Sequence, residues 1–459
     1  MPSNPYRFSG PIREAADFYG RARELRHIFE RIRKRESVNV IGERRSGKTS
    51  LLLHLLHPSV QQQYIPDEQE ELLYVYLDAE TVPQTPEGFF HDLLARTRAR
   101  YPDLPALPPD QTASEQGVRA FLEALAPRRL VLLLDEFEGI SSCTGFPPRF
   151  FMFLRGLNIG YNLSFVVATC NRLSECCPIE IATSPFPNIF KGIELGPFAP
   201  EEMADFLART SASGGAPIAE VPSFIEGLAG HHPYLAQMAC WHYFETWVER
   251  GQWDQEAHET VRRRFTEEAG PHFKAVWERY LPADEKQALR ALVAGESIDP
   301  QLLWRLERRG HVREGQIASQ VLADVIARQS DVPAGSGEDL PRPPALPPAQ
   351  GLWVDEESGQ AYLDGDLLDP PLPDHQYQLL KLLCQNEGKI CTPYMIIQAV
   401  WSEDYIDEVD DQRIAQLTSR LRKRIEPDGK PWRYILTVHG RGLTLGSGSP
   451  AQEDADAEM

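Results

Sequence analysis

The sequence predicts an α/β protein: a parallel β-sheet flanked by helices, then a helical segment, a winged helix and a separate C-terminal winged helix-turn-helix module. Three observations support this prediction. A glycine-rich loop joins an apolar strand to a helix near residue 42, two further apolar runs have the continuous pattern of buried parallel strands, and a Pro-rich stretch at 331–350 sets apart the C-terminal residues. At 459 residues the chain is long enough for roughly three domains.

The glycine-rich loop runs from Gly42 to Thr49 and reads GERRSGKT, which fits the phosphate-binding pattern G-x-x-x-x-G-K-[ST]. It follows the apolar stretch Val38–Ile41 and precedes the helix-forming run SLLLHL. Its backbone N–H groups are expected to face phosphates, with Lys48 neutralising the β and γ oxygens and the Thr49 hydroxyl holding Mg²⁺. The helix adds its positive N-terminal end. The predicted nucleotide contacts are Gly42, Glu43, Arg44, Arg45, Ser46, Gly47, Lys48, Thr49 and Ser50.

A second strand, Leu130–Leu134, ends in Asp135 and Glu136. Its continuous apolar run suits a parallel strand covered on both faces, and open α/β sheets bind ligands at the carboxyl ends of such strands. This is the pattern of a Walker B strand. We expect Asp135 to help hold Mg²⁺ and Glu136 to orient or deprotonate the water that attacks the γ-phosphate.

A third apolar strand, Ser164–Thr169, is followed by Cys170, Asn171 and Arg172. A polar side chain at this end of the sheet can sense the γ-phosphate. Thr169, Asn171 and Arg172 all fit that position, and each could instead cap the loop. We favour Arg172 as the sensor, because a cation responds most strongly to the phosphate charge.

Composition sets limits on partners and location. The net charge is −20 with a pI of about 5.1, so the chain as a whole repels nucleic acid and any DNA contact requires a local basic patch. Seven cysteines without CxxC spacing predict reduced thiols rather than a disulfide or zinc framework. The N-terminus does not read as a signal peptide, and no run of about 18 apolar residues predicts a membrane span. We therefore expect a cytoplasmic protein.

The region after the third strand is mostly helical by pattern, most clearly at 201–210 and 234–250. His232 and Pro233 lie at the start of the second of these helices, where Pro suits the first turn. Residues 271–329 predict three short helices and a polar hairpin at 310–317, the order of a winged helix. The last residues, 447–459, are acidic and small and are expected to be disordered.

Several segments together resemble the STAND branch of AAA+-related ATPases over residues 4–329: the opening NPYRFSGPIREAADFYGRARELRHIF, the loop GERRSGKTSLL, the strand LLLDEFE, and LAGHHPYL. The resemblance implies that Tyr19, Gly20 and Arg21 pack near the adenine. It also implies that His232 and Pro233, between a helical lid and the winged helix, touch the nucleotide and report its state; a simple helix N-terminus is the alternative. The chain departs from the usual threonine-arginine sensor by having Cys170 and Asn171 before Arg172.

The C-terminal residues 351–446 resemble the winged helix-turn-helix DNA-binding domain of OmpR/PhoB-type response regulators, on the runs SRLRKRIE and YILTVHGRGLTL. A small antiparallel sheet is expected at 351–368, and a helix at 411–425 should bury Ile414, Leu417, Leu421 and Ile425. The predicted organisation is an ATPase core at 1–198, a helical lid at 199–265, a winged helix at 266–330, a Pro-rich linker at 331–350, the DNA-binding domain at 351–446 and a disordered tail at 447–459.

Local charge supports DNA binding, since residues 412–445 hold eight basic residues against two acidic ones, a local charge of +6. On the recognition helix, side chains opposite the apolar face suit base edges, basic side chains near its end suit phosphates, and a wing arginine suits the minor groove. Acidic residues at the helix start, including Asp411, leave a solvated basic helix or a protein-binding winged helix as alternatives. The predicted DNA contacts are Gln412, Arg413, Gln416, Ser419, Arg420, Arg422, Lys423 and Arg441.

These expectations describe an ATP-driven switch that uses ATP/ADP and Mg²⁺, hydrolyses ATP slowly, forms ATP-dependent homo-oligomers and regulates transcription by binding double-stranded DNA. The activating signal or partner protein is unknown, and no membrane contact is expected. One alternative is an ATPase acting on DNA, as in replication or transposition, or a defence ATPase whose winged helix binds a protein; another is a nucleotide-binding scaffold with negligible turnover. A regulator should select one short repeated site, whereas an ATPase machine should bind DNA broadly.

Overall fold

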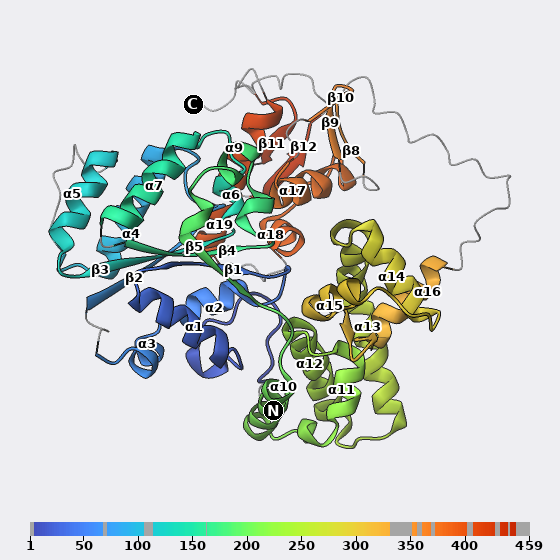
Figure 1. The fold of residues 1–459 in the computed structure, drawn as a ribbon. Coiled ribbons are helices and arrows are strands. Elements are labelled where there is room, and N and C mark those ends of the chain that lie inside the picture. The colour runs from blue at the N-terminus through green and yellow to red at the C-terminus, as the bar shows by residue number, and fades with distance from the viewer. Residues whose placement is uncertain are drawn as a thin grey trace. The chain divides into compact units, whose positions relative to one another are not determined.

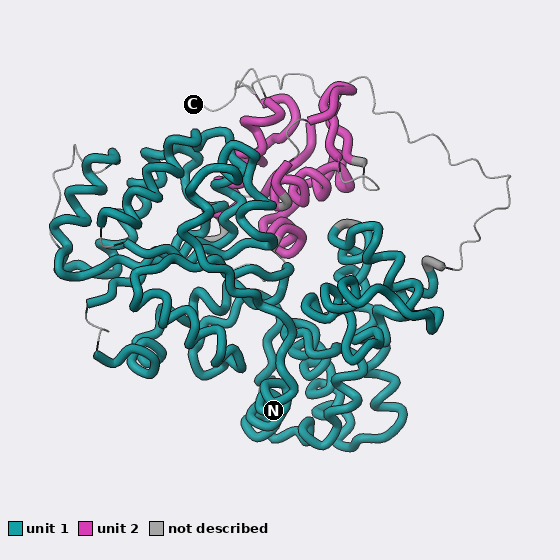
Figure 2. The backbone as a smooth tube through the Cα atoms, viewed as in Figure 1, with its two compact units in different colours: residues 1–331 teal, residues 332–459 magenta. Residues whose placement is uncertain are grey.

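A computed structural model describes residues 4–67, 71–104, 113–161, 163–330, 351–355, 360–368, 372–401, 407–426, 432–438 and 441–446. The chain forms two compact units, residues 1–331 and 332–459 (Figure 2). The predicted linker at 331–350 and tail at 447–459 lie outside the described residues. Within the described part of the chain, no helix combines the length and hydrophobicity needed to span a bilayer.

The first unit contains a five-stranded parallel sheet with the strand order β2-β3-β4-β1-β5. This confirms the predicted parallel α/β sheet. The strands are β1 (Ser37–Ile41), β2 (Leu72–Asp78), β3 (Arg129–Asp135), β4 (Leu163–Thr169) and β5 (Phe190–Glu194). β1, β3 and β4 are the three strands expected from the sequence. All seven residues of β3 and of β4 are buried, as expected for strands covered on both faces.

Helices cover both faces of this sheet (Figure 1). Leu130, Leu132 and Leu134 of β3 pack into one core, and the alternate Val131 and Leu133 pack into the other, as the two-residue period of a strand requires. The first core is completed by α4 (Pro86–Arg100), α5 (Glu115–Leu125) and α7 (Pro148–Gly160), and the second by α1 (Ala22–Arg33), α2 (Lys48–His54) and α3 (Pro58–Tyr64).

The helical segment and the winged helix share a third core. Its helices are α10 (Pro200–Gly214), α11 (Pro222–Ala229), α12 (Pro233–Arg250), α13 (Gln255–Ala275), the π-helical η6 (Val276–Tyr280), α14 (Ala283–Val293), α15 (Pro300–Arg309) and α16 (Gln320–Ser330), with the hairpin β6 (Val312–Arg313) and β7 (Gln316–Ile317). The region 271–329, predicted as three short helices and a hairpin, includes α14, α15, α16 and the β6–β7 hairpin, and α13 continues through Pro271 into this region. The predicted lid boundary at residue 265 thus falls inside α13.

The second unit has a core of its own. A three-stranded antiparallel sheet precedes three helices and a hairpin. The elements are β8 (Leu352–Asp355), β9 (Gln360–Leu363), β10 (Asp366–Leu367), α17 (Asp374–Gln385), α18 (Pro393–Trp401), α19 (Asp407–Ile425), β11 (Ile435–Val438) and β12 (Gly442–Leu445). The predicted apolar face of α19 is confirmed, since Ile414, Leu417, Leu421 and Ile425 are all buried.

Candidate functional site

The phosphate loop turns from β1 into α2 with a backbone that needs both of its glycines. A Cβ atom on Gly42 would lie 2.5 Å from Ser46 Oγ and 3.0 Å from the Leu195 carbonyl oxygen. Gly47, the residue before α2, has a φ of 95°, where side chains are strained. Arg45 also has a positive φ, 67°. The glycine spacing in the sequence therefore reflects the shape of this loop.

Lys48 lies inside the loop with its side chain buried. Its Nζ donates to the carbonyl oxygens of Gly42 at 2.9 Å and Glu43 at 3.2 Å, and lies 3.7 Å from Cys170 Sγ. Burial opposes the charge on Lys48, but Cys170 and the neighbouring carboxylate of Glu136 outweigh it and raise the pKa. The Lys48 ammonium is therefore charged, and a phosphate bound in the loop could replace the two carbonyl oxygens as its hydrogen-bond acceptor.

Asp135 ends β3 beside this ammonium and is 2% exposed. Its Oδ2 accepts a hydrogen bond from the Tyr76 hydroxyl at 3.0 Å, and its Oδ1 accepts one from the Glu136 N–H at 3.1 Å. Burial and the charge of Glu136 raise the pKa of Asp135 above its usual value. A hydrogen bond with Thr49 and the charge of Lys48 offset only part of this shift. The Thr49 hydroxyl and the Asp135 carboxylate thus lie together, and both are oxygen ligands of the kind that Mg²⁺ takes.

The residues after β4 have different surroundings. Thr169 Oγ1 accepts from Asn39 Nδ2 at 2.7 Å and donates to the Asn171 carbonyl oxygen at 2.6 Å, so it holds two segments together. The Arg172 side chain is 61% exposed and pairs with Glu194 at 2.9 Å. Within this segment, Cys170 Sγ lies 3.7 Å from Lys48 Nζ. The sensor role expected for Arg172 stays a prediction, and it requires the Glu194 pair to open.

The N-terminal opening residues join the phosphate loop to α10. Arg21 is 3% exposed, and its Nη2 donates to the carbonyl oxygens of Gly196 at 2.7 Å and Ser46 at 3.3 Å. Its backbone N–H donates to the Glu202 carboxylate. The Tyr19 ring lies edge-on to Phe206 of α10. Gly20 has a φ of 68° and lies close to Phe198, while Ser50 Oγ accepts a hydrogen bond from the Ile12 N–H at 3.0 Å.

The start of α12 also faces the loop. Arg45 donates to the Tyr234 hydroxyl at 2.7 Å, and its guanidinium carbon lies 4.2 Å from the centre of that ring. His232 is the residue before α12, and Pro233 is the first residue of the helix. Burial lowers the pKa of His232 to about 4, so its ring is neutral near pH 7. Its neighbours include the His272 ring, 5.8 Å away.

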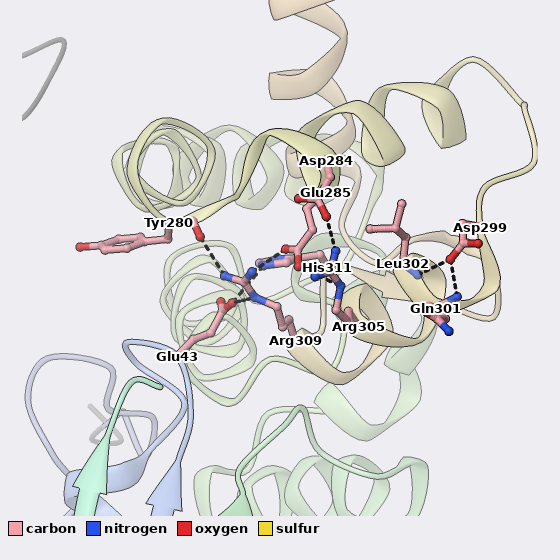
Figure 3. Close-up of polar contacts among 10 residues, drawn as sticks. All are labelled: Glu43, Tyr280, Asp284, Glu285, Asp299, Gln301, Leu302, Arg305, Arg309 and His311. Atoms are coloured by element: carbon pink, nitrogen blue, oxygen red, sulfur yellow. Dashed lines mark hydrogen bonds and ion pairs between the residues drawn. The ribbon is translucent and has the colours of Figure 1, made fainter. Parts of the chain in front are cut away.

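Residues of the winged helix meet the loop at Glu43, as Figure 3 shows. The Glu43 carboxylate pairs with Arg309 Nε, and His311 Nε2 lies 3.4 Å from Glu43 Oε1. Arg309 and His311 were not among the predicted site residues. A sequence signal exists in the run ERRGHVREG, which places basic residues around the turn of the predicted wing. Sequence alone does not show that this turn faces the phosphate loop.

In the second unit, α19 presents the predicted base-reading side chains. Gln412, Gln416 and Ser419 are exposed, and Arg413 is partly exposed. Lys423 is also exposed, Arg420 is partly exposed, and Arg441 is exposed just before β12. The structure thus leaves this set accessible along the face opposite the buried one.

Arg422 differs from the other predicted phosphate contacts. Its Nη2 donates to the Ile435 carbonyl oxygen at 2.6 Å and to Thr437 Oγ1 at 2.8 Å. The guanidinium carbon lies 4.9 Å from the centre of the Trp432 ring. Glu426, one of the two acidic residues in the basic segment 412–445, is 5% exposed. Its carboxylate accepts hydrogen bonds from the backbone N–H groups of Arg433, Tyr434 and Ile435. Arg422 and Glu426 therefore both fix the C-terminal hairpin to α19.

Fold and site together define the class: a P-loop NTPase joined to a winged helix-turn-helix domain of DNA-binding type. More particularly, the chain belongs to the family described as Novel STAND NTPase 2, whose model matches residues 33–297. Residues 369–445 match the family described as Transcriptional regulatory protein, C terminal. Both resemblances drawn from the sequence are confirmed by these matches.

The relatives with curated names match about a fifth of this chain. The uncharacterized transcriptional regulatory protein YcbL of Bacillus subtilis is 35% identical over 96 residues, which is 21% of this chain and 40% of the relative. The sensory transduction protein RegX3 of Mycobacterium tuberculosis is 32% identical over 92 residues, 20% of this chain and 39% of the relative. The chain therefore spans about 40% of the length of these relatives.

Among solved structures, the Walker-type ATPase paby2304 of Pyrococcus abyssi is 17% identical, covering 69% of this chain and 98% of that one with a TM-score of 0.48. The DNA-binding domain of CpxR from E. coli is 27% identical, covering 22% of this chain and 94% of that one with a TM-score of 0.19.

Proposed function

We propose that this NTPase is an ATP-dependent switch whose output is regulated DNA binding, used to control transcription. The observation that carries the proposal is the convergence of Lys48, Thr49 and Asp135 at one end of the sheet, in a chain that also holds a DNA-binding type of domain. A phosphate site alone would suit many enzymes. Its fusion to a response-regulator-type domain favours a signalling role.

In the proposed site, the phosphate loop and Lys48 bind the phosphates, while Tyr19, Gly20 and Arg21 line the base. Thr49 and Asp135 would hold Mg²⁺, which would neutralise charge developing on the phosphates. Glu136 would take a proton from the attacking water. We propose slow turnover, so that hydrolysis returns the switch to its ADP form.

In this scheme the part that moves is the helical segment with the winged helix, which contacts the phosphate loop. Arg45 of the phosphate loop touches Tyr234 at the start of α12, and His232 lies directly before that helix. We propose that ADP keeps the helical segment and winged helix closed over the site, and that ATP releases them. Released subunits would then associate and bring several DNA-binding domains together, which raises the effective concentration of each further contact.

The remaining assignments are proposals of the same kind. The output is double-stranded DNA binding through α19 and the wing, which implies a cytoplasmic location. We divide the first unit into an ATPase core at 1–198, a lid at 199–265 and a winged helix at 266–330, although the lid and winged helix share a core and are expected to move together.

The test first identifies the nucleotide that copurifies with the protein. The mass of the protein in solution and its affinity for DNA are then measured with ADP and with a slowly hydrolysed ATP analogue. We expect bound ADP, a monomer with ADP and a larger species with the analogue. A protein that binds neither nucleotide, or whose mass and DNA affinity are the same with both, would overturn the proposal.

A further inference from the structure

The end of α15 carries two consecutive arginines, Arg308 and Arg309, and each pairs with a carboxylate of the sheet-containing part of the unit. Arg309 pairs with Glu43 in the phosphate loop, and Arg308 pairs with Glu194 at the end of β5. Glu43 lies two residues after β1, Glu194 is the last residue of β5, and these two strands are paired, with Ile41 opposite Glu194. One helix end therefore touches two segments that border the nucleotide site.

The guanidinium of Arg309 has partners on three sides (Figure 3). Its Nε faces Glu43, its Nη1 donates to Glu285 Oε2 at 2.5 Å, and its Nη2 donates to the Tyr280 carbonyl oxygen at 3.0 Å. Glu285 is 2% exposed and belongs to α14, so the winged helix itself fixes the direction of Arg309. The planar guanidinium of arginine has several donors in a fixed arrangement and can make all three contacts, whereas the ammonium of a lysine cannot.

Glu43 is held from two directions. Its backbone carbonyl oxygen accepts from Lys48 Nζ, while its carboxylate faces Arg309 and His311. Burial alone would raise the pKa of Glu43, but His311 and Arg309 outweigh it and hold that pKa well below its usual range. The carboxylate is therefore ionised, and it lies in the loop that would receive the phosphates. The Glu43 carboxylate adds negative charge to the loop that would receive the phosphates, and Arg309 and His311 of the winged helix offset that charge.

The second ion pair, between Arg308 and Glu194, shares its carboxylate with Arg172, the predicted sensor. Glu194 accepts a hydrogen bond from Arg172 through Oε1 and forms an ion pair with Arg308 through Oε2, so one carboxylate joins the segment after β4 to α15. The backbones also approach here, because a Cβ atom on Gly196 would lie 2.9 Å from the Arg308 carbonyl oxygen. This close approach is a contact independent of the two ion pairs.

We propose that Arg308 and Arg309 form a clamp that holds the winged helix on the nucleotide site, with Glu43 and Glu194 as its two acceptors. The inference rests on the proposed switch and names the residues that couple nucleotide to winged helix. Because coupling is reciprocal, opening the clamp must change ADP retention by the same factor by which ADP changes the closing of the clamp. An open clamp also leaves Glu194 with Arg172 as its ion-pair partner in place of the two arginines it now shares.

The test compares the full-length double variant Arg308→Gln/Arg309→Gln with Arg263→Ala. Arg263 is the matched control, because it is an exposed arginine that pairs with Glu267 on its own helix, α13, and shares no partner with Arg308 or Arg309. Release of a fluorescent ADP analogue should be about tenfold faster in the double variant, within the ~5–150-fold range of coupled sites, and unchanged in Arg263→Ala. Arg309→Lys should also release ADP faster, since it keeps the charge without the planar guanidinium.

Hydrogen exchange of α15 in nucleotide-free protein gives a second readout. We expect lower protection at residues 300–309 in the double variant and in Glu194→Gln than in wild type. Wild-type exchange and wild-type ADP release in these variants would overturn the clamp. If wild type itself shows no difference between ADP and ATP, the proposed switch fails, while exchange at α15 still decides whether the clamp exists. If the double variant does not fold, Glu194→Gln and Arg309→Lys decide the outcome.

Discussion

Arg422 and Lys423 are neighbours on α19 that the sequence places in one class of phosphate contacts, and the structure separates them. The Arg422 guanidinium holds Ile435 and Thr437 of β11, whereas Lys423 is exposed. We therefore expect Arg422→Ala to destabilise the C-terminal unit and Lys423→Ala to leave its stability unchanged. The pair makes a matched comparison of two adjacent basic residues.

The size of the Arg422 effect follows from its contacts. Hydrogen bonds to a charged group contribute about 1.5–3 kcal/mol when buried, and an exposed cation–π contact about 0.5–1 kcal/mol. Because Arg422 is only partly buried, solvent replaces some of this, and we expect a total loss of about 2 kcal/mol. For a folded domain of about 95 residues, as at 351–446, each kcal/mol shifts Tm by about 4–8 °C, so Tm should fall by about 8–16 °C.

Two assays on the full-length protein decide the matter: thermal unfolding followed calorimetrically, and DNA binding by fluorescence anisotropy at several salt concentrations. Arg422→Ala should lower the Tm of the C-terminal unit and leave the salt slope unchanged. Lys423→Ala should keep Tm and reduce the slope by about one, the value for one lost phosphate contact. The reverse pattern, with Arg422→Ala at wild-type Tm and a reduced slope, would show that Arg422 binds phosphate and that the hairpin argument is wrong.

Three further outcomes are expected. Lys48→Ala should abolish binding of a fluorescent ADP analogue, whereas Glu136→Gln should bind ATP without releasing phosphate; normal turnover by Glu136→Gln would remove its assigned role. His232→Ala should speed ADP release and increase ATP-dependent self-association at unchanged Tm, and an unaltered release rate would make His232 a simple helix start. Gln416→Ala should reduce discrimination between operator variants by ~1–3 kcal/mol, measured by competition binding, and undiminished selectivity would exclude a base contact.

The sequence predicted those parts of the fold that a local pattern determines. β3 and β4 have continuous apolar runs, and both are interior strands of the sheet. The two strands that the sequence analysis did not single out, β2 and β5, are both edge strands. β5 contains Lys191 and Gly192, which are exposed, so its burial pattern gives little signal of a strand. A short edge strand such as β5 can be recognised only together with the strand it pairs with, and that strand, β1, is distant in the sequence.

Pro271 shows a second limit. A proline lacks an N–H group and constrains the residue before it, so in a sequence it is a local signal for a helix boundary. In the structure α13 continues through Pro271 while burying Phe265, Ala269 and Phe273 in the shared core. Packing of the helix on both sides of the proline outweighs the local preference. The predicted boundary between lid and winged helix, at residue 265, lies within this same helix.

The phosphate loop shows why the contacts between parts of the unit could not be derived from the motif. The pattern G-x-x-x-x-G-K-[ST] fixes the residues that shape the loop and bind phosphate, and it leaves four positions free. In this chain two of those free positions hold Glu43, which faces the winged helix, and Arg45, which faces Tyr234 of α12. Both side chains are charged and lie on the loop itself, so any shift of the loop on nucleotide binding reaches α12 and α15 directly. The motif thus fixes the residues that bind phosphate, whereas we expect control of the site to depend on residues that the motif does not constrain.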